Sequence, residues 1–579
     1  MATQLGSRKE GAQVKADGCC TPKEDKIPQK VRVAPKRVLP IIFLPGIMGS
    51  NLRLKPERQA KLGKNNNIAW RPDRILEAAT LINASPAERQ LQLDPSQTEV
   101  DIYEVDKSIT GDPLEAPRDR HKVTFSDNFH IGINTVLLSD DPIGAKNSKT
   151  KEVKAMERGW GEIYLGSYQD ILEKCEQQLN GPSDYTILNG IFDRDPKVWG
   201  AHPSNKLKPL TLDEYRKAVK ECWFPVHAMG YNWLDTNSKS AQLVAERILA
   251  VISKYKEQNY SCEKVIIVTH SMGGLLARAL IHPEIGGIEA QVLGVVHGVM
   301  PAIGAPAAYR RMRCGTESSG GDPANMVLGQ FGSGVTAVLG NSQGGLELLP
   351  SKAYGNGWLE IRKNGYVLKR LPENGDPYRE IYQLKNSWFR LLREEWLNPA
   401  GLNNRGFKNS CKLLDGAKFF HEQINSTYHK LSYAHYGADP SRHSWETLAW
   451  ELDPKYKGKD WEKLAIYSDG KMGDLRLFES NADAPDSGDG PSAVISISEI
   501  DMVSSNQSFS LAMGVSKGAG DQTVPLRSSD QQLLSNKFAG VFRQVGYEHQ
   551  KSYKDPFATK ATLYSLVRVA ETMTWTENG

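Results

Sequence analysis

The chain has 579 residues, of which 39% are hydrophobic and 24% charged, and its mean hydropathy is −0.47. This length allows several domains of about 150 residues, or one large catalytic domain with long insertions. The composition excludes a collagen, a coiled coil and a chain that is disordered throughout.

Most of the positive charge lies near the N-terminus. Residues 1–37 carry nine Lys or Arg against four Asp or Glu, whereas the whole chain has a formal net charge of +4. The remainder therefore sums to about −1, which argues against a nucleic-acid partner. Because residues 1–37 lack apolar periodicity, we expect a disordered arm, with a membrane-surface or export arm as the alternative.

The seven cysteines are scattered and form no C-x-x-C pair, so we expect neither a disulfide framework nor a zinc site, and no cofactor. No apolar run reaches the roughly 20 residues of a membrane helix, and no signal-peptide stretch is present. We therefore expect a protein that is made in the cytoplasm and does not use the general secretory route.

Buried strands and amphipathic helices alternate along the chain. The apolar runs at residues 38–46, 264–270, 291–299 and 540–546 predict strands. Helical spacing follows at residues 240–256, from Met272 toward Ala279, and after Asp555. This order predicts an α/β fold with a mostly parallel central sheet and helices on both faces.

The predicted core is divided by two long insertions. We assign residues 38–54, 223–309 and 500–579 to the core, 55–222 to a first cap insertion and 310–499 to a second cap or lid insertion. Residues 325–350 alternate apolar residues with glycines. They are either a flexible flap beside the active site or an irregular core helix.

A candidate nucleophile lies where an apolar strand runs directly into a helix, at Thr269-His270-Ser271-Met272-Gly273. A sharp strand-to-helix turn lifts a serine Oγ clear of the sheet and places it at a helix N-terminus. The usual pattern is G-x-S-x-G, from which Thr269 departs. A buried strand with an unreactive Ser-Gly turn is the alternative, and we expect His270 to have a packing role.

The loop LPGIMGS, residues 44–50, follows the first strand and contains two glycines that let the backbone approach a ligand closely. A tetrahedral intermediate needs two backbone donors, and the Ile47 and Met272 N–H groups are our candidates. An ordinary Pro-Gly turn is the alternative.

A candidate acid and base occur late in the chain. Asp521 lies in the turn GDQTVPL, and His549 follows 28 residues later in YEHQ. The order Ser, Asp, His is that of the α/β-hydrolase fold, so we expect Asp521 to hold His549 and His549 to deprotonate Ser271. His297 is the best alternative base, although its position suits core packing.

Six segments carry a resemblance to a known family. These are LPGIMGSNL, GYNWLDT, THSMGGLLAR, GGLELLPS, GDQTVPL and YEHQ. Together they resemble lecithin:cholesterol acyltransferase-like and PGAP1-like lipases, and the chain most resembles the large bacterial type VI secretion phospholipase effectors. Thr269 and Gln522 depart from glycines of the family pattern.

The resemblance implies Ser271 as nucleophile, Asp521 as acid and His549 as base on an α/β-hydrolase fold. It also implies a phospholipid substrate at a membrane surface, a cognate immunity protein, a secretion-system component, and action in the periplasm or at the membranes of target cells.

Other readings stay open at this stage. The same triad serves a glycolipid deacylase or an acyltransferase, and a hydrolase-fold protein can act by membrane insertion or partner capture alone. Asp483, Asp486 and Asp489 have a spacing that suits calcium but lack the Glu and Gly of an EF-hand loop, so we expect a surface loop and no metal.

Overall fold

The computed structural model describes residues 6–10, 13–18, 29–33, 35–73, 80–102, 151–180, 190–316, 328–479, 492–497 and 518–576. The loop with Asp483, Asp486 and Asp489 lies outside these residues.

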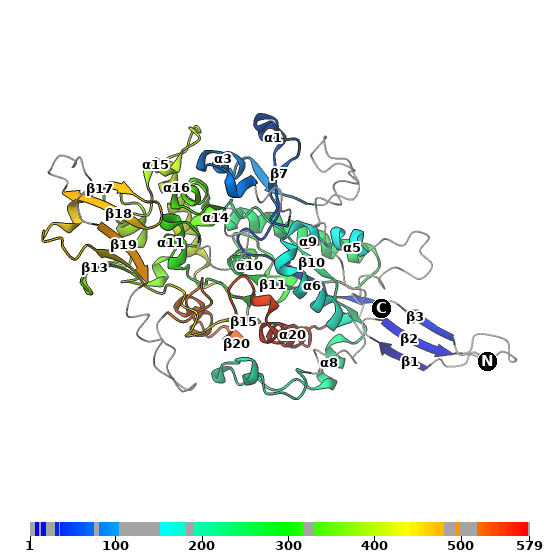
Figure 1. Cartoon of the computed structure of the whole chain (residues 1–579). Coiled ribbons are helices and arrows are strands. Elements are labelled where there is room, and N and C mark those ends of the chain that lie inside the picture. The colour runs from blue at the N-terminus through cyan, green and yellow to red at the C-terminus, as the bar shows by residue number, and fades with distance from the viewer. Residues whose placement is uncertain are drawn as a thin grey trace.

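A six-stranded parallel sheet forms the centre of the molecule (Figure 1). Its order is β10 (Val226–Ala228), β5 (Ile41–Leu44), β11 (Val265–His270), β12 (Val292–Gly298), β15 (Ser432–Gly437) and β20 (Phe538–Gln544). Every neighbouring pair is parallel. The four predicted strands are therefore present, and two further strands complete the sheet.

Both faces of this sheet are buried, which explains why its strands are continuous apolar runs. Along β5, Ile41 and Phe43 point into one hydrophobic cluster, whereas Ile42 and Leu44 point into another. Successive side chains of a strand point to opposite faces, so a strand covered on both sides must be apolar throughout.

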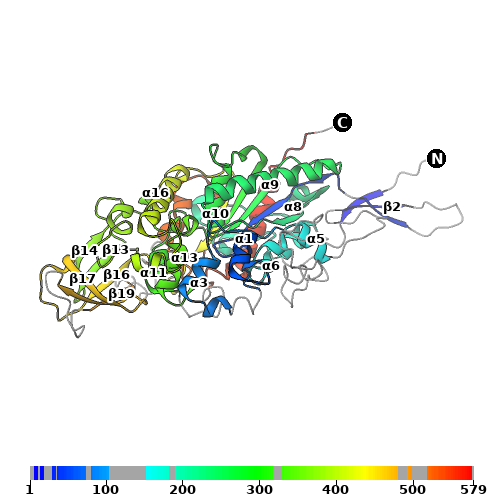
Figure 2. The same ribbon diagram turned by 90° about the horizontal axis from the view of Figure 1, so that it is seen from above.

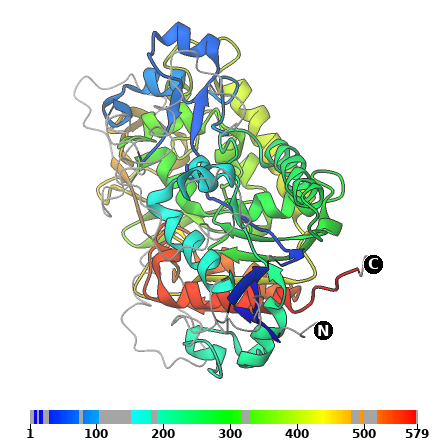
Figure 3. The same cartoon turned by 90° about the vertical axis from the view of Figure 1, so that its right-hand side faces the viewer.

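Helices cover each face. On one side, α9 (Asn237–Glu257) packs with α10 (Gly273–Ile281), and α10 contacts β5, β11 and β12. On the other side, α6 (Leu165–Asn180, cyan) and α20 (Pro556–Ala570, red) lie together (Figure 3). The predicted α/β-hydrolase architecture, a parallel sheet between two helical layers, is confirmed.

Three assignments of the sequence analysis need correction. Strand β15 belongs to the central sheet, although residues 310–499 were expected to be an insertion throughout. Its sequence SYAHYG mixes small, aromatic and polar residues, so it lacks the apolar run that marks the other strands. Likewise α6 covers the central sheet, although it falls within the expected first insertion, residues 55–222.

The third correction concerns the N-terminal arm. An antiparallel sheet of β1 (Gly6–Glu10), β2 (Gln13–Gly18) and β3 (Gln29–Val33) stands where disorder was expected in residues 1–37. Figure 2 shows it at the end of the molecule opposite the second insertion. Pairing of β2 with both neighbours satisfies backbone hydrogen-bonding groups, which composition does not reveal.

The second insertion contains a mixed sheet of its own. Its order is β14 (Tyr366–Leu371), β13 (Leu359–Lys363), β16 (Leu448–Leu452), β19 (Ser492–Ile497), β18 (Asp474–Glu479) and β17 (Leu464–Asp469). A smaller antiparallel sheet places β6 (Leu52–Leu54), at the end of the first core segment, between β7 (Ile68–Trp70) and β8 (Thr98–Val100) of the first insertion. Two short strands, β4 (Arg37–Val38) and β9 (Cys222–Trp223), pair beside the core.

The remaining α-helices of the described residues are α1 (Pro56–Leu62), α3 (Pro86–Gln92), α5 (Lys151–Glu157), α8 (Leu212–Val219), α11 (Pro306–Cys314), α13 (Gly332–Leu339), α14 (Gln343–Leu346), α15 (Glu394–Leu397), α16 (Phe407–Ile424), α18 (Leu526–Ser529) and α19 (Gln531–Leu534). None of the helices in the described part of the chain is long and apolar enough to cross a membrane.

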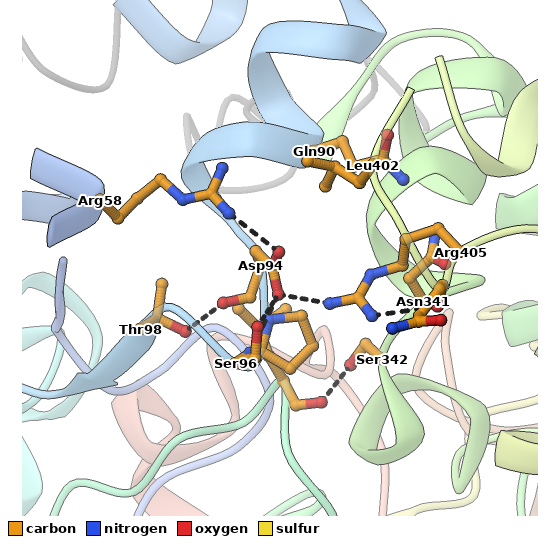
Figure 4. Close-up of polar contacts among 12 residues, drawn as sticks. Arg58, Gln90, Asp94, Ser96, Thr98, Asn341, Ser342, Leu402 and Arg405 are labelled. Carbon is orange, nitrogen blue, oxygen red and sulfur yellow. Dashed lines mark hydrogen bonds and ion pairs between the residues drawn. The ribbon is translucent and has the colours of Figure 1, made fainter. Parts of the chain in front are cut away.

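A buried carboxylate joins the two insertions (Figure 4). Asp94 of the first insertion accepts from Arg58 Nη2 at 3.3 Å and from Arg405 Nη2 of the second insertion at 2.6 Å. Ser96 also donates to it, through both its N–H and its hydroxyl group. Because these charges are paired and largely buried, removal of either arginine would leave the Asp94 carboxylate partly uncompensated at the contact between the two insertions.

Candidate active site

Ser271 lies in the turn between β11 and α10, in a strained backbone conformation. Its φ is +52°, in the left-handed region that non-glycine residues rarely adopt. The turn is tight: a Cβ added to Gly273 would lie 2.5 Å from the Leu44 carbonyl oxygen. Glycine at 273 thus lets α10 begin directly against the end of β5.

The candidate base, His549, lies in the loop after β20. His549 Nε2 lies 2.8 Å from Ser271 Oγ, and His549 Nδ1 lies 2.8 Å from Asp521 Oδ2. All three residues are buried, with Asp521 fully enclosed. The three side chains that the sequence singled out therefore form one hydrogen-bonded row, although they are far apart in the chain.

The candidate acid, Asp521, is held by hydrogen bonds within its own turn. Asp521 Oδ1 accepts from the Val524 N–H at 2.7 Å and from the Thr523 N–H at 3.1 Å, which leaves Oδ2 for His549. Gln522, where the family pattern has glycine, has a φ of +70°. The structure thus accommodates this departure by holding a glutamine in a conformation that glycine adopts without strain.

Ser444 supports this turn and was missed by the sequence analysis. Its Oγ accepts from the Asp521 N–H at 2.8 Å and from the Gln522 N–H at 2.7 Å. Ser444 is fully buried. No spacing or motif marks it, because it precedes the turn by more than 70 residues and belongs to the loop after β15.

The candidate oxyanion loop lies directly on the nucleophile turn. A Cβ on Gly46 would be 2.9 Å from His270 Nδ1 and 3.0 Å from Ser271 Cβ. Among the described residues, no acceptor is paired with the N–H of Ile47 or of Met272. Neither N–H group therefore has an intramolecular acceptor among these residues.

The alternative base is not at the site. His297 lies on β12, opposite Thr269 of β11, and its Nδ1 is 3.5 Å from Thr269 Oγ1. Burial lowers the pKa of His297 to about 3. His297 is thus a neutral core residue, as its place at the end of a strand suggested.

A cavity of about 120 Å³ lies above Ser271 and His549. Most of its described lining is apolar, and the side chains come from α11, α13 and the segments beside them. These residues include Ala308, Met312, Leu328, Leu339 and Leu348. Apart from histidine, Arg311 is the only charged residue among the described lining residues, and it donates to Thr523 Oγ1 at 3.0 Å.

The segment 325–350 was expected to be either a flexible flap or an irregular core helix, and its described part is largely helical. Residues 325–327 lie outside the described residues, whereas α13 and α14 form helices with glycines at close contacts. Leu328, Leu339 and Leu348 also line the cavity. A helical, glycine-containing segment therefore covers the candidate active site.

Within the ranges that the structure describes, no group of three or more His, Cys, Asp or Glu residues is placed to hold a metal ion.

Comparisons with known proteins agree with this architecture. The PGAP1-like alpha/beta domain family matches residues 232–309, which include β11, Ser271, α10 and β12. The chain has an α/β-hydrolase fold. A search of curated proteins gives no match to this hydrolase.

Among solved structures, the hydrolase is similar to one chain of the crystal structure of the Tle4–Tli4 complex. The TM-score is 0.70 and the sequence identity 29%, over 93% of this chain and 99% of that chain. The similarity therefore extends beyond the core to the inserted regions, and the predicted resemblance is confirmed. Together the two similarities support a lipase-like hydrolase.

Proposed function

We propose that the protein is a serine-dependent carboxylic-ester hydrolase of the phospholipase A type, which works through an acyl-enzyme. The observation that carries this proposal is the row Ser271–His549–Asp521, in which both side-chain contacts measure 2.8 Å. The nucleophile, its base and the group that orients the base thus lie in hydrogen-bonding order.

Each residue has one role in the proposed reaction. His549 Nε2 takes the proton of Ser271 as Oγ attacks the ester carbonyl, and the N–H groups of Ile47 and Met272 receive the oxyanion. His549 then returns the proton to the leaving alcohol, and water releases the acyl group by the same steps. Asp521 holds the Nδ1 proton and stabilises the imidazolium.

The cavity suits a lipid ester. Its apolar lining accepts a hydrocarbon chain at low cost, because apolar surface is removed from water. Arg311 adds a positive charge beside Thr523 at the same cavity. A guanidinium group pairs well with a phosphate, so this combination supports a substrate with both an acyl chain and a phosphodiester.

The proposed setting is antibacterial. We take the protein to be a type VI secretion effector that is made in the cytoplasm and acts on phospholipids in the periplasm or at the membranes of target cells. A cognate immunity protein and a secretion-system component are its proposed partners. The resemblance of six sequence segments and the similarity to a chain of the Tle4–Tli4 complex support this setting.

Activity-based labelling tests the proposed chemistry. The wild-type protein should react with a fluorophosphonate probe and release fatty acid from defined phospholipids, and product identification assigns the cleaved position. Ser271→Ala should fold normally and lose both properties, because no oxygen nucleophile remains next to His549. A purified Ser271→Ala protein that retains turnover would contradict the mechanism.

A further inference from the structure

A second row of buried hydrogen bonds lies beneath the candidate active site. The Gly46 N–H donates to the Tyr168 hydroxyl oxygen at 3.2 Å. The Tyr168 hydroxyl group lies 3.0 Å from His270 Nδ1, and His270 Nε2 lies 3.0 Å from the His549 backbone oxygen. This row joins the oxyanion loop to the loop that carries the base.

The partners determine where each proton lies. The His549 carbonyl oxygen only accepts, so His270 Nε2 must carry a hydrogen. Burial keeps the imidazole neutral, so Nδ1 carries no hydrogen and accepts from the Tyr168 hydroxyl group, whose oxygen accepts from the Gly46 N–H. His270 is therefore a neutral imidazole with its hydrogen on Nε2.

Burial keeps this protonation state stable. Tyr168 and His270 are each about 1% exposed. Burial, and secondarily the charge of a protonated His549, lowers the pKa of His270 to about 3. His270 thus stays neutral through the pH range in which His549 would act as a base, and the direction of the row does not change.

The row contacts both the proposed oxyanion loop and the backbone of the proposed catalytic histidine. Gly46 directly precedes Ile47, whose N–H is a proposed oxyanion donor. At the other end, His270 holds the His549 carbonyl group, while the His549 N–H donates to the Asp521 carbonyl oxygen at 2.8 Å. The backbone of His549 is therefore tied on both sides of the imidazole that faces Ser271.

We propose that Tyr168 and His270 are positioning residues that hold the oxyanion loop and the catalytic histidine at the correct separation. This inference rests on the proposed function. Packing alone does not require it, since phenylalanine would fill both aromatic positions. Phenylalanine at 168 would leave the Gly46 N–H and His270 Nδ1 without their partner in a buried place, which costs free energy and frees the loop to move.

Tyr168→Phe tests the row, with Tyr553→Phe as a matched control. Tyr553 is also buried against His270, with ring centroids 6.0 Å apart, but its hydroxyl group donates to the Thr269 carbonyl oxygen at 2.7 Å and does not reach the oxyanion loop. Each variant removes one buried hydroxyl group from the same neighbourhood. The readouts are kcat and KM on a soluble short-chain ester and the rate of fluorophosphonate labelling.

Tyr168→Phe should lower kcat and the labelling rate by about tenfold to a hundredfold, because small misplacements of reacting groups have effects of this size. Its KM should change less than about twofold, since Tyr168 is not among the residues that line the cavity. Tyr553→Phe should stay within about twofold of wild type in both constants. Equal kcat values for the two variants would overturn the proposal.

Substitutions of His270 separate the two ends of the row. Glutamine can place an amide N–H where Nε2 donates to His549, whereas asparagine can place a carbonyl oxygen where Nδ1 accepts from Tyr168. His270→Gln should therefore retain more turnover than His270→Asn. The double variant Tyr168→Phe/His270→Asn should lose less than the product of the two single losses, because both break the same row.

Two outcomes distinguish this inference from the proposed function. A wild-type protein that neither labels nor hydrolyses esters would contradict the proposed function itself. A wild-type protein that does both, with additive effects of the Tyr168 and His270 variants and equal turnover of the two His270 variants, would contradict only the positioning role. Thermal unfolding of each variant identifies any that do not fold, and the His270 pair then provides the test.

Discussion

His549 and Asp521 are joined twice, once through their side chains and once through their backbones. Nδ1 of His549 lies 2.8 Å from Asp521 Oδ2, and the His549 N–H donates to the Asp521 carbonyl oxygen at 2.8 Å. The backbone hydrogen bond does not depend on either side chain, so it should hold the two loops together even when Asp521 or His549 is substituted. The contact between Asp521 Oδ2 and His549 Nδ1 therefore mainly determines which nitrogen of the His549 imidazole carries the hydrogen.

Asp521→Asn should change the tautomer of His549 while leaving the backbone hydrogen bond between the two loops in place. The N–H groups of Thr523 and Val524 require an oxygen at the Oδ1 position, so an asparagine must turn its NH₂ group toward His549. His549 would then carry its hydrogen on Nε2 and be unable to accept the proton of Ser271. Turnover should fall by on the order of 10⁴, as in other triads with this change.

Asp439→Asn is the control for Asp521→Asn. Asp439 is a buried acid in the loop after β15, and it accepts from the Gly546 N–H at 2.9 Å without touching His549. Its substitution should change turnover less than about tenfold. A reversed order of the two losses would mean that Asp521 is not the acid of the triad.

The closed cavity predicts activation by lipid aggregates. About 120 Å³ of space lies above Ser271, whereas ligand sites usually hold about 300–1,000 Å³. The segments around α11 and α13 must therefore move before a long acyl chain can bind. The rate on a short-chain phospholipid should rise sharply above its critical micelle concentration. A rate per dissolved molecule that stays the same across this concentration would count against a moving lid.

A buried histidine predicts loss of stability in acid. His435 on β15 has both ring nitrogens buried without a partner among the described residues. Its ring packs on Tyr553 with centroids 5.1 Å apart. Burial lowers the pKa of His435 to about 3. The unfolded chain binds this proton below about pH 6.5 and the folded chain does not, so stability falls as the pH decreases from 6.5 toward 3.

His435→Phe should reduce this dependence on pH. Between about pH 6.5 and 4.5 the wild type should lose about 2 kcal/mol more unfolding free energy than the variant, because the unfolded histidine becomes almost fully protonated over these two pH units whereas the folded one does not. Urea unfolding at several pH values measures the difference. Parallel profiles for the two proteins would show that His435 does not take part in the acid sensitivity.

The parts of the molecule differ in how well sequence predicts them, and β11 and β15 illustrate the reason. Strand β11, with the sequence VIIVTH, is buried on both faces and is followed by a turn with a recognisable chemical role. Strand β15, SYAHYG, is equally buried, yet it carries polar residues, and a partner such as that of Tyr436 is brought to it only in the folded protein. Tyr436, for example, donates to Asp530 at 2.7 Å, and Asp530 is distant in sequence.

The candidate active site shows the same contrast between features that are local in sequence and contacts that depend on tertiary packing. The order and turn context of Ser271, Asp521 and His549 are local properties, and these residues could be singled out from sequence. The contacts of Ser444 with the acid turn and of Tyr168 with Gly46 depend on how distant segments pack. The pairing of His270 with Tyr168 and His549 is also tertiary, so sequence could assign His270 only a packing role.

The last prediction concerns a protein partner, because the proposed chemistry endangers the cell that makes the enzyme. Under the proposed function the bilayer of the producer would itself be a substrate, so something must prevent self-digestion. The chain is similar to one chain of a two-protein complex, over 99% of that chain. We therefore expect a dedicated immunity protein that blocks the cavity above Ser271 or holds the covering segments closed, with a total buried area of at least about 1,600 Å².

Expression in the periplasm of a bacterial host tests this expectation. The wild type should be toxic alone and harmless together with its cognate immunity protein, whereas Ser271→Ala should be harmless without any partner. The Tyr168→Phe variant should be less toxic than Tyr553→Phe if toxicity follows turnover. Toxicity that persists in Ser271→Ala would mean that the damage is not hydrolytic, and a protein that acts by inserting into membranes would then explain it better.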